Sequence, residues 1–190
     1  MSAPIEAAAY HAGLVVHAVD AAIARYERLF GATFAIFEYD KSASRLAEAP
    51  APATRLRVAY GRVAGMTFEL IQPLDGNGTH AEFLEKRGEG VHHFGFWVPD
   101  LQRAVEGALE HGARLTSASI TAAGSAVVSI AGMAPHDVAR VVGPPVAFVD
   151  MGDGPEIELV GAAAIGALET LLGDRLADII DPPPWPTAGG

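Results

Sequence analysis

The chain has 190 residues, half of them hydrophobic, and its 13 basic and 23 acidic residues give a net charge of −10. This composition is typical of a folded globular protein, and the acidic balance argues against binding to nucleic acid, which needs clustered Lys and Arg. The sequence has no cysteine, which excludes disulfides, thiolate metal sites and cysteine nucleophiles, so that any metal must be held by His, carboxylate or amide groups.

The first predicted module covers residues 8–75. A short apolar strand begins near His11, and a helix follows whose start is marked by Asp20, a capping residue type, and whose end is marked by Gly31. Three strands are then predicted near 33–39, 55–63 and 66–72, with an Ala/Pro-rich loop over 40–54. The order of elements is therefore strand, helix and three strands.

A linker over residues 76–90, with a short helix around 80–87, separates this module from a second one over 91–162. The second module again begins with a strand, and its helix runs from Asp100 to Gly112. Its later strands are predicted near 114–119, 125–131, 146–150 and 155–160, with a long loop over 132–145. Each module is thus a strand, a helix and then about three strands.

The C-terminal part, residues 163–190, is predicted to form an amphipathic helix and a loose Pro-rich tail. The helix is indicated by the helical spacing of Ile165, Leu168, Leu171, Leu172 and Leu176. A helix of this kind would cover an open sheet edge or pack on a partner subunit.

An internal repeat connects the two modules. Each begins with His-x-Gly, His11 to Gly13 and His93 to Gly95, and each has an Asp before its helix and a Gly-Ala pair after it. Phe68-Glu69-Leu70 in the last strand of the first module matches Ile157-Glu158-Leu159 in the second. The repeat predicts an α+β fold built of two pseudo-symmetric modules.

Four residues in equivalent places of the two modules are predicted to hold one divalent metal ion: His11, Glu69, His93 and Glu158. Pseudo-twofold symmetry would bring them face to face, and a buried carboxylate is costly unless it is paired or bound to a metal. The Gly two residues after each His would leave room for a ligand beside that imidazole. Two imidazoles and two carboxylates suit a divalent first-row ion.

Other polar residues have weaker claims to a role in the site. His92 should point to the face opposite His93, because side chains alternate along a strand. His17 ends a strand, His80 and His111 fit surface or cap positions, and His136 lies in the long loop of the second module. Lys86 and Arg87 form either a contact for a substrate phosphate or a solvated helix end.

Residues 83–93, Phe-Leu-Glu-Lys-Arg-Gly-Glu-Gly-Val-His-His, resemble the methylmalonyl-CoA epimerase branch of the vicinal oxygen chelate (glyoxalase/bleomycin resistance/dioxygenase) superfamily. The similar stretch runs over 68–115, and more general matches extend the resemblance over most of 10–161. It implies two βαβββ modules whose mixed sheets curl into an open metal-binding cup. It also assigns the ligand roles to the same two His and two Glu residues, around an ion of Co, Mn, Ni, Zn or Fe.

The sequence departs from the epimerase pattern in two places. The branch usually has a catalytic Glu shortly before the strand at 55–63; here Glu48 is the nearest carboxylate, and Glu156, two residues before Glu158 on the same strand face, is a second candidate for the general base. The second module is also longer than expected, and the extra length over 116–145 would lie over the pocket mouth. Both departures suggest a changed substrate or reaction.

The resemblance implies a metal-dependent isomerase or lyase that stabilises an enolate next to a carbonyl, similar to methylmalonyl-CoA epimerase or glyoxalase, with Glu158 also near the reacting atoms. The alternatives are a ferrous-iron ring-cleaving dioxygenase and a non-catalytic drug-binding protein. The expected partner is a small molecule with adjacent oxygens or a thioester carbonyl. We expect a cytoplasmic protein with no membrane partner, because the N-terminus lacks a signal-peptide pattern and no apolar run is long enough to span a bilayer. The acidic charge argues against a nucleic-acid partner, and the resemblance implies a homodimer.

Overall fold

The computed structural model of the protein describes residues 5–41, 44–45, 54–76, 78–119 and 146–185. The first half contains β1 (Ala8–Val15), α1 (Val19–Phe30), β2 (Phe34–Lys41), β3 (Ser44–Arg45), β4 (Thr54–Val63), β5 (Met66–Pro73) and then α2 (Gly78–Arg87). The second half contains β6 (Gly90–Val98), α3 (Leu101–Glu110), β7 (Arg114–Ser119), β8 (Val146–Asp150) and β9 (Glu156–Gly161). It ends in two 3-10 turns and two helices: η1 (Ala162–Ala164), α4 (Ile165–Leu172), η2 (Gly173–Arg175) and α5 (Leu176–Ile179). None of the helices in these ranges is long and apolar enough to cross a membrane.

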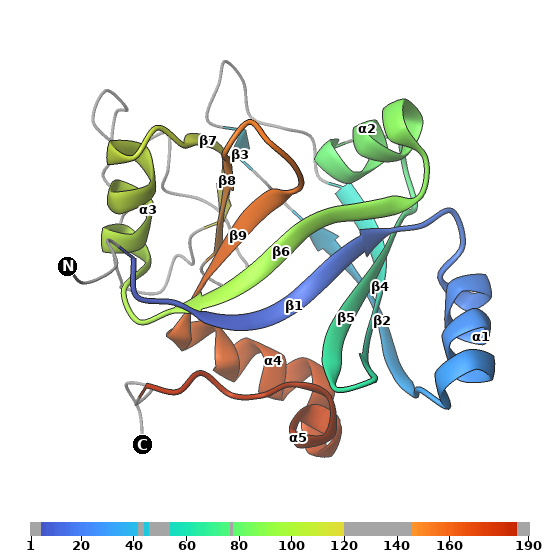
Figure 1. The fold of residues 1–190 in the computed structure, drawn as a ribbon. Helices are drawn as coiled ribbons and strands as arrows, with labels where there is room; N and C mark the ends of the chain where they lie inside the picture. The colour runs from blue at the N-terminus through green and yellow to red at the C-terminus, as the bar shows by residue number, and fades with distance from the viewer. Residues whose placement is uncertain (1–4, 42–43, 46–53, 77, 120–145, 186–190) are drawn as a thin grey trace.

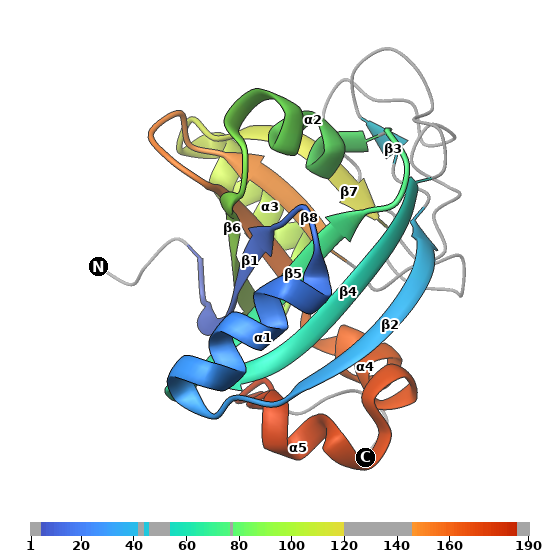
Figure 2. The same ribbon diagram turned by 90° about the vertical axis from the view of Figure 1, so that its right-hand side faces the viewer.

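All the strands belong to one sheet in the order β2-β4-β5-β1-β6-β9-β8-β7-β3. The antiparallel pair β1 and β6 lies at its centre, and each of these strands has a parallel neighbour from its own half, β5 beside β1 and β9 beside β6. The strand order therefore runs outward in the same way from both central strands, as a pseudo-twofold axis requires. The predicted α+β fold of two related strand–helix–strands units is confirmed, and Figures 1 and 2 show how the sheet curls.

Helices α1 and α3 cover the outer, convex side of the two halves, as Figure 1 shows at either side of the central strands. Val19, Ala22 and Ile23 of α1 are buried in a cluster with residues of β4 and β5, and α3 packs in the same way on β7, β8 and β9. Asp100 is the N-cap of α3 and accepts a hydrogen bond from the backbone N–H of Arg103, as predicted. An N-cap of this type stabilises a helix by about 1 kcal/mol.

The predicted capping role of Asp20 is wrong. The N-cap of α1 is Ala18, which offers no side-chain acceptor, and Asp20 lies inside the first turn. Its carboxylate instead accepts two hydrogen bonds from the Arg57 guanidinium, with N–O distances of 2.8 and 2.9 Å. The other end agrees with the prediction, because Gly31 is the C-cap with a left-handed φ of 64°, which a residue without Cβ adopts at little cost.

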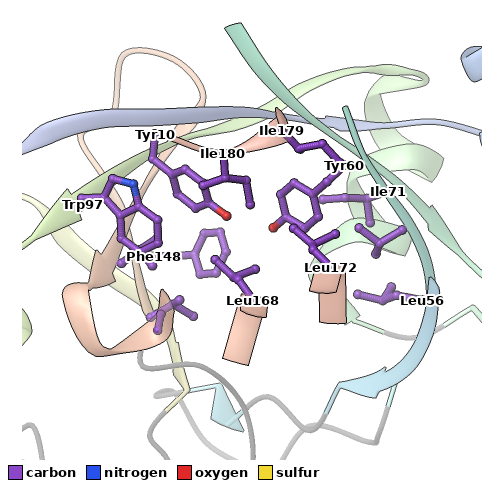
Figure 3. Packing of buried hydrophobic residues seen from close by; sticks show 14 of the residues in the cluster. Tyr10, Leu56, Tyr60, Ile71, Trp97, Phe148, Leu168, Leu172, Ile179 and Ile180 are labelled. Carbon is purple, nitrogen blue, oxygen red and sulfur yellow. The ribbon is translucent and has the colours of Figure 1, made fainter. Parts of the chain in front are cut away.

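The C-terminal segment packs inside the curl of the sheet and not on a sheet edge, so the expectation that it covers an edge is wrong. Leu168 and Leu172 of α4 and Ile179 and Ile180 at the end of α5 are buried against inner-face residues of the strands, among them Tyr10, Leu56, Tyr60, Ile71, Trp97 and Phe148 (Figure 3). Polar contacts fasten the segment: the Thr67 hydroxyl donates to the Ile179 carbonyl at 2.7 Å, and the Trp97 indole N–H donates to the Asp181 carbonyl at 3.2 Å. The inner face is therefore closed on this side by the chain's own apolar residues.

Candidate metal centre

The four predicted ligand residues meet on the inner face of the sheet. Each comes from one of the four central strands: His11 from β1, Glu69 from β5, His93 from β6 and Glu158 from β9. All four are buried, with exposed fractions of 8% or less. The two Nε2 atoms are 3.0 Å apart, and Glu69 Oε2 lies 3.3 Å from His11 Nε2 and 3.2 Å from His93 Nε2. Glu158 Oε2 lies 3.1 and 3.6 Å from the same two nitrogens.

These separations fit the coordination shell of one small divalent ion. With metal–ligand bonds of about 2.1 Å, neighbouring donors lie about 3.4 Å apart in a tetrahedron and about 3.0 Å apart at adjacent corners of an octahedron. The observed distances between these donors cover that interval. Nitrogen and carboxylate donors together suit first-row ions such as Zn, Mn, Co or Fe. We call these four residues the His/Glu group.

The glycine of each His-x-Gly motif makes room for the imidazole of the other half. In the central antiparallel pair, His11 lies opposite Gly95 and Gly13 lies opposite His93. A Cβ atom on Gly13 would lie 2.1 Å from His93 Cε1, and one on Gly95 would lie 2.3 Å from His11 Cε1. The expectation that each glycine leaves space for a ligand beside its own His is therefore wrong: the space holds the imidazole from the other half. Two Nε2 atoms can approach to 3.0 Å only because both glycines lack a side chain.

The electrostatics of the His/Glu group favour a positive charge between the carboxylates. Burial lowers the pKa of His11, but hydrogen bonds and Coulombic attraction from Glu158 and Glu69 outweigh burial and raise it to about 9. Burial likewise raises the pKa of Glu69, and hydrogen bonds from His11 and His93 outweigh it and hold that pKa well below its usual value. At neutral pH the imidazole of His11 in the metal-free group is therefore protonated on both nitrogens and positively charged. A divalent ion would have to displace the proton on Nε2.

Residue 92 lies beside the group, against prediction. The pairing of β1 with β6 shifts register between the Gly13–His93 and Leu14–Val91 pairs, so that His92 is the extra residue of a bulge. The simple alternation that would have pointed His92 to the other face is broken there, and His92 Nδ1 lies 3.1 Å from His93 Nδ1. The prediction that His92 faces away is therefore wrong.

His80, assigned to the surface or a cap from sequence, is buried instead, with 4% of its surface exposed. It projects from α2, and its ring centroid lies 4.6 Å from that of His92. His17 is exposed and His111 is the C-cap of α3. His136, Glu48 and the predicted strand near 125–131 lie outside the described residues.

A cavity of about 480 Å³ lies next to α2 and is separated from the His/Glu group by His92, whose ring lines it. It is lined by residues of α2, β6, β7, β8, the turn before β9 and the first residue of β9: Thr79, Glu82, Phe83, Lys86, Arg87, His92, Arg114, Leu115, Thr116, Asp150, Gly154, Pro155 and Glu156. Glu156 Oε2 lies 3.9 Å from His92 Nε2, so this carboxylate stands next to the His/Glu group but outside it. The volume falls within the range of small-molecule sites.

Sequence reasoning missed the aromatic side chains that surround the imidazoles. The Tyr10 ring stands edge-on to that of His11 with centroids 4.2 Å apart, the Tyr60 ring does so at 6.0 Å, and the Phe148 ring lies 5.1 Å from that of His93. Tyr60 pairs with Glu69 and Phe148 with Glu158 across their ladders. Only the strand register, which the sequence pattern did not give, could have placed them.

The family model of the glyoxalase/bleomycin resistance protein/dioxygenase superfamily matches residues 10–131, more than half of the chain. The chain belongs to this superfamily. The match agrees with the resemblance carried by residues 83–93 and with the sheet order around β1 and β6.

Individual relatives are more distant. The uncharacterized protein YqjC of Bacillus subtilis (strain 168) is 29% identical over 86 residues, which are 45% of this chain and 54% of YqjC, so the match spans about half the length of that relative. The hypothetical protein BH1468 from Bacillus halodurans C-125 has 19% identity and a TM-score of 0.53 over 82% of this chain and 94% of its own. Methylmalonyl-CoA epimerase from Mycobacterium tuberculosis has 23% identity and a TM-score of 0.52 over 85% and 92%. At these identities, the two structures establish a shared fold.

Proposed function

We propose that His11, Glu69, His93 and Glu158 bind one divalent first-row ion and that the protein is a metal-dependent isomerase or lyase acting next to a carbonyl. The observation that carries the proposal is the meeting of two buried imidazoles and two buried carboxylates, with Nε2–Nε2 and Nε2–Oε2 distances of 3.0 to 3.6 Å. Membership of a superfamily that includes glyoxalases supports it, and so does the fold shared with a methylmalonyl-CoA epimerase.

The ion, when bound, would polarise a carbonyl oxygen and stabilise the negative charge that develops there after loss of the adjacent proton. The residues of the chain contribute the rest. Burial of the His/Glu group among Tyr10, Tyr60 and Phe148 keeps bulk water from the charges, and electrostatic effects are stronger where water is excluded. The strand backbones hold the four side chains in place without loop movement.

Glu156 is the proposed proton acceptor. It lines the cavity next to His92, and its side chain is 23% exposed, so it can meet a substrate there. The α-carbon–hydrogen bond breaks, the proton passes to a carboxylate oxygen of Glu156, and the electron pair moves toward the carbonyl oxygen. Return of a proton from Glu156 to the α-carbon completes the exchange, and inversion of the centre requires a second proton donor on the opposite face.

The substrate is proposed to be an acyl thioester or a molecule with adjacent oxygens, with its remote part in the cavity. The walls of the cavity are amphipathic: Phe83 and Leu115 offer apolar surface, and Arg87 lies over the Phe83 ring at 5.8 Å. Arg87 also lines the cavity, where its charge helps to lower the pKa of Asp150 and would attract an anionic group of the substrate.

The test is exchange of the substrate α-proton in deuterium oxide, with methylmalonyl-CoA and simpler acyl thioesters, followed by nuclear magnetic resonance alongside metal analysis of the same protein. We expect exchange that stops on chelation and returns with a divalent ion. His93→Ala should lose both the ion and the exchange, while His17→Ala, an exposed histidine outside the group, should lose neither.

Exchange that survives chelation would contradict the proposal. Oxygen uptake that requires ferrous iron would favour the ring-cleaving dioxygenase instead. Stoichiometric binding of aromatic ligands to metal-free protein, without turnover, would favour a binding protein.

A further inference from the structure

We infer that His92 is a positioning residue: by accepting a hydrogen bond from Nδ1–H of His93, it fixes the tautomer and ring orientation in which His93 Nε2 is free to bind the ion. The inference rests on the proposed metal centre. His92 lies outside the His/Glu group, and its Nδ1 atom lies 3.1 Å from Nδ1 of His93.

The direction of this hydrogen bond follows from the geometry of the group. Nε2 of His93 faces His11, Glu69 and Glu158, so it must present its lone pair to a bound ion. A neutral imidazole with a bare Nε2 carries its hydrogen on Nδ1. Within the described ranges, His92 Nδ1 lies at hydrogen-bond distance from that hydrogen and therefore accepts it, so the hydrogen of His92 lies on Nε2.

The second nitrogen of His92 then points to the cavity. Its Nε2 lies 3.9 Å from Glu156 Oε2, too far for a direct hydrogen bond but close enough for charge attraction or a bridging water. The order Glu156, His92, His93 is that of a carboxylate–imidazole support behind a metal-binding imidazole. Such supports set the orientation and basicity of metal ligands in other proteins.

The ring of His92 is held by packing on several sides. His80 from α2 lies against it with a centroid distance of 4.6 Å, Phe83 stands at 5.2 Å, and the ring is almost fully buried, at 5% exposure. The side chain is aimed inward by the bulge at its own position, a device that re-orients side chains beside functional sites. A fixed acceptor at this place holds the partner imidazole more firmly than water could.

The other half of the molecule lacks this support, which provides an internal comparison. A second register shift lies before His11, where Tyr10 takes the place that His92 has before His93. Tyr10 packs its ring on His11 and Trp97, and His11 Nδ1 has no hydrogen-bond partner within the described ranges. The two metal-facing imidazoles are therefore held differently: one by aromatic packing and one by a hydrogen bond.

The experiment compares Co²⁺ affinity of the full chain and two variants at position 92, measured by competition with a chromophoric chelator. His92→Leu removes the acceptor at similar volume, and His92→Asn restores a polar atom near the place of Nδ1. We expect about 10- to 100-fold weaker Co²⁺ binding by H92L and recovery of most of the loss by H92N. Wild-type affinity in folded H92L, or equally weak binding by both variants, would overturn the inference.

A second measurement needs no variant and covers the case in which H92L does not fold. In the Zn²⁺-loaded wild-type protein, nitrogen-15 resonances should show hydrogen on Nδ1 of His93 and on Nε2 of His92. The reverse tautomer at either ring would overturn the inference. Failure of the wild-type protein to bind either ion would instead overturn the metal centre itself, so the two proposals fail in distinguishable ways.

Discussion

Placing one methyl group on either central glycine should damage the His/Glu group more than its size suggests. A Cβ on Gly13 would lie 2.1 Å from His93 Cε1, whereas ordinary contact begins at 3.4 Å, so the imidazole would have to retreat by roughly 1.3 Å. Gly95→Ala repeats the clash against His11, at 2.3 Å. The ring cannot retreat freely, because His93 is 1% exposed and packed against Phe148. Overpacking of this kind costs about 1–3 kcal/mol of folding free energy.

The effect on the site should exceed the effect on stability. A displacement of roughly 1 Å at a functional group costs on the order of 100-fold in function, so we expect Co²⁺ affinity to fall by about that factor in Gly13→Ala and Gly95→Ala. Chelator competition would measure the affinity, and denaturant unfolding of the metal-free protein would measure the stability. Gly76→Ala is the matched control, because its Cβ meets nothing within 4 Å and its φ is not positive. Wild-type Co²⁺ affinity in Gly13→Ala would refute the reciprocal-glycine reasoning.

Of four further predictions, two concern pH, one concerns the proposed base and one concerns the C-terminal segment. Because the pKa of His11 is raised to about 9 in the metal-free protein, Co²⁺ must displace a proton from His11 to bind. The apparent affinity for Co²⁺ should therefore rise by up to about tenfold per pH unit until pH 9 and then level off. A Co²⁺ affinity independent of pH between about 6.5 and 9 would contradict this. The same raised pKa stabilises the metal-free fold fully below pH 6.5, and unfolding titrations should show that contribution lost as pH rises through about 9. Glu156→Gln should slow α-proton exchange about 100-fold or more when measured at saturating Co²⁺, and unaltered exchange would remove Glu156 from the mechanism. Leu172→Ala should destabilise the protein by about 2–5 kcal/mol in denaturant unfolding, since this side chain is buried on the inner face; a cost below about 1 kcal/mol would mean that α4 does not close the curl.

The parts of the fold that depend on periodic patterns could be predicted from the sequence. The repeat of His-x-Gly, Asp and Gly-Ala gave both strand–helix–strands units, and the helix at 80–87 and the strands at 114–119 and 146–150 were placed within two residues of their observed ends. The meeting of His11, Glu69, His93 and Glu158 was predicted from the pseudo-twofold repeat together with the family resemblance, because equivalent strand positions face a common axis.

The parts that depend on register and long-range packing could not be predicted. A bulge shifts the phase of side chains by one residue and leaves no mark in the sequence, so the inward turn of His92 and Tyr10 was missed. The apolar face predicted for α4 showed that this helix is buried against another surface. It did not show whether that surface is a sheet edge, a second subunit or the inner face of the chain's own sheet. The clash that fixes the role of Gly13 spans two halves of the chain and is visible only in the paired strands.

The most direct test of the metal centre is a crystal structure of the metal-loaded protein with anomalous diffraction at the absorption edge of the bound ion. We expect a single ion bonded to His11 Nε2, His93 Nε2 and the carboxylates of Glu69 and Glu158, at about 2.0–2.2 Å. An ion bound elsewhere, or a His/Glu group that stays metal-free in protein catalysing α-proton exchange, would contradict it.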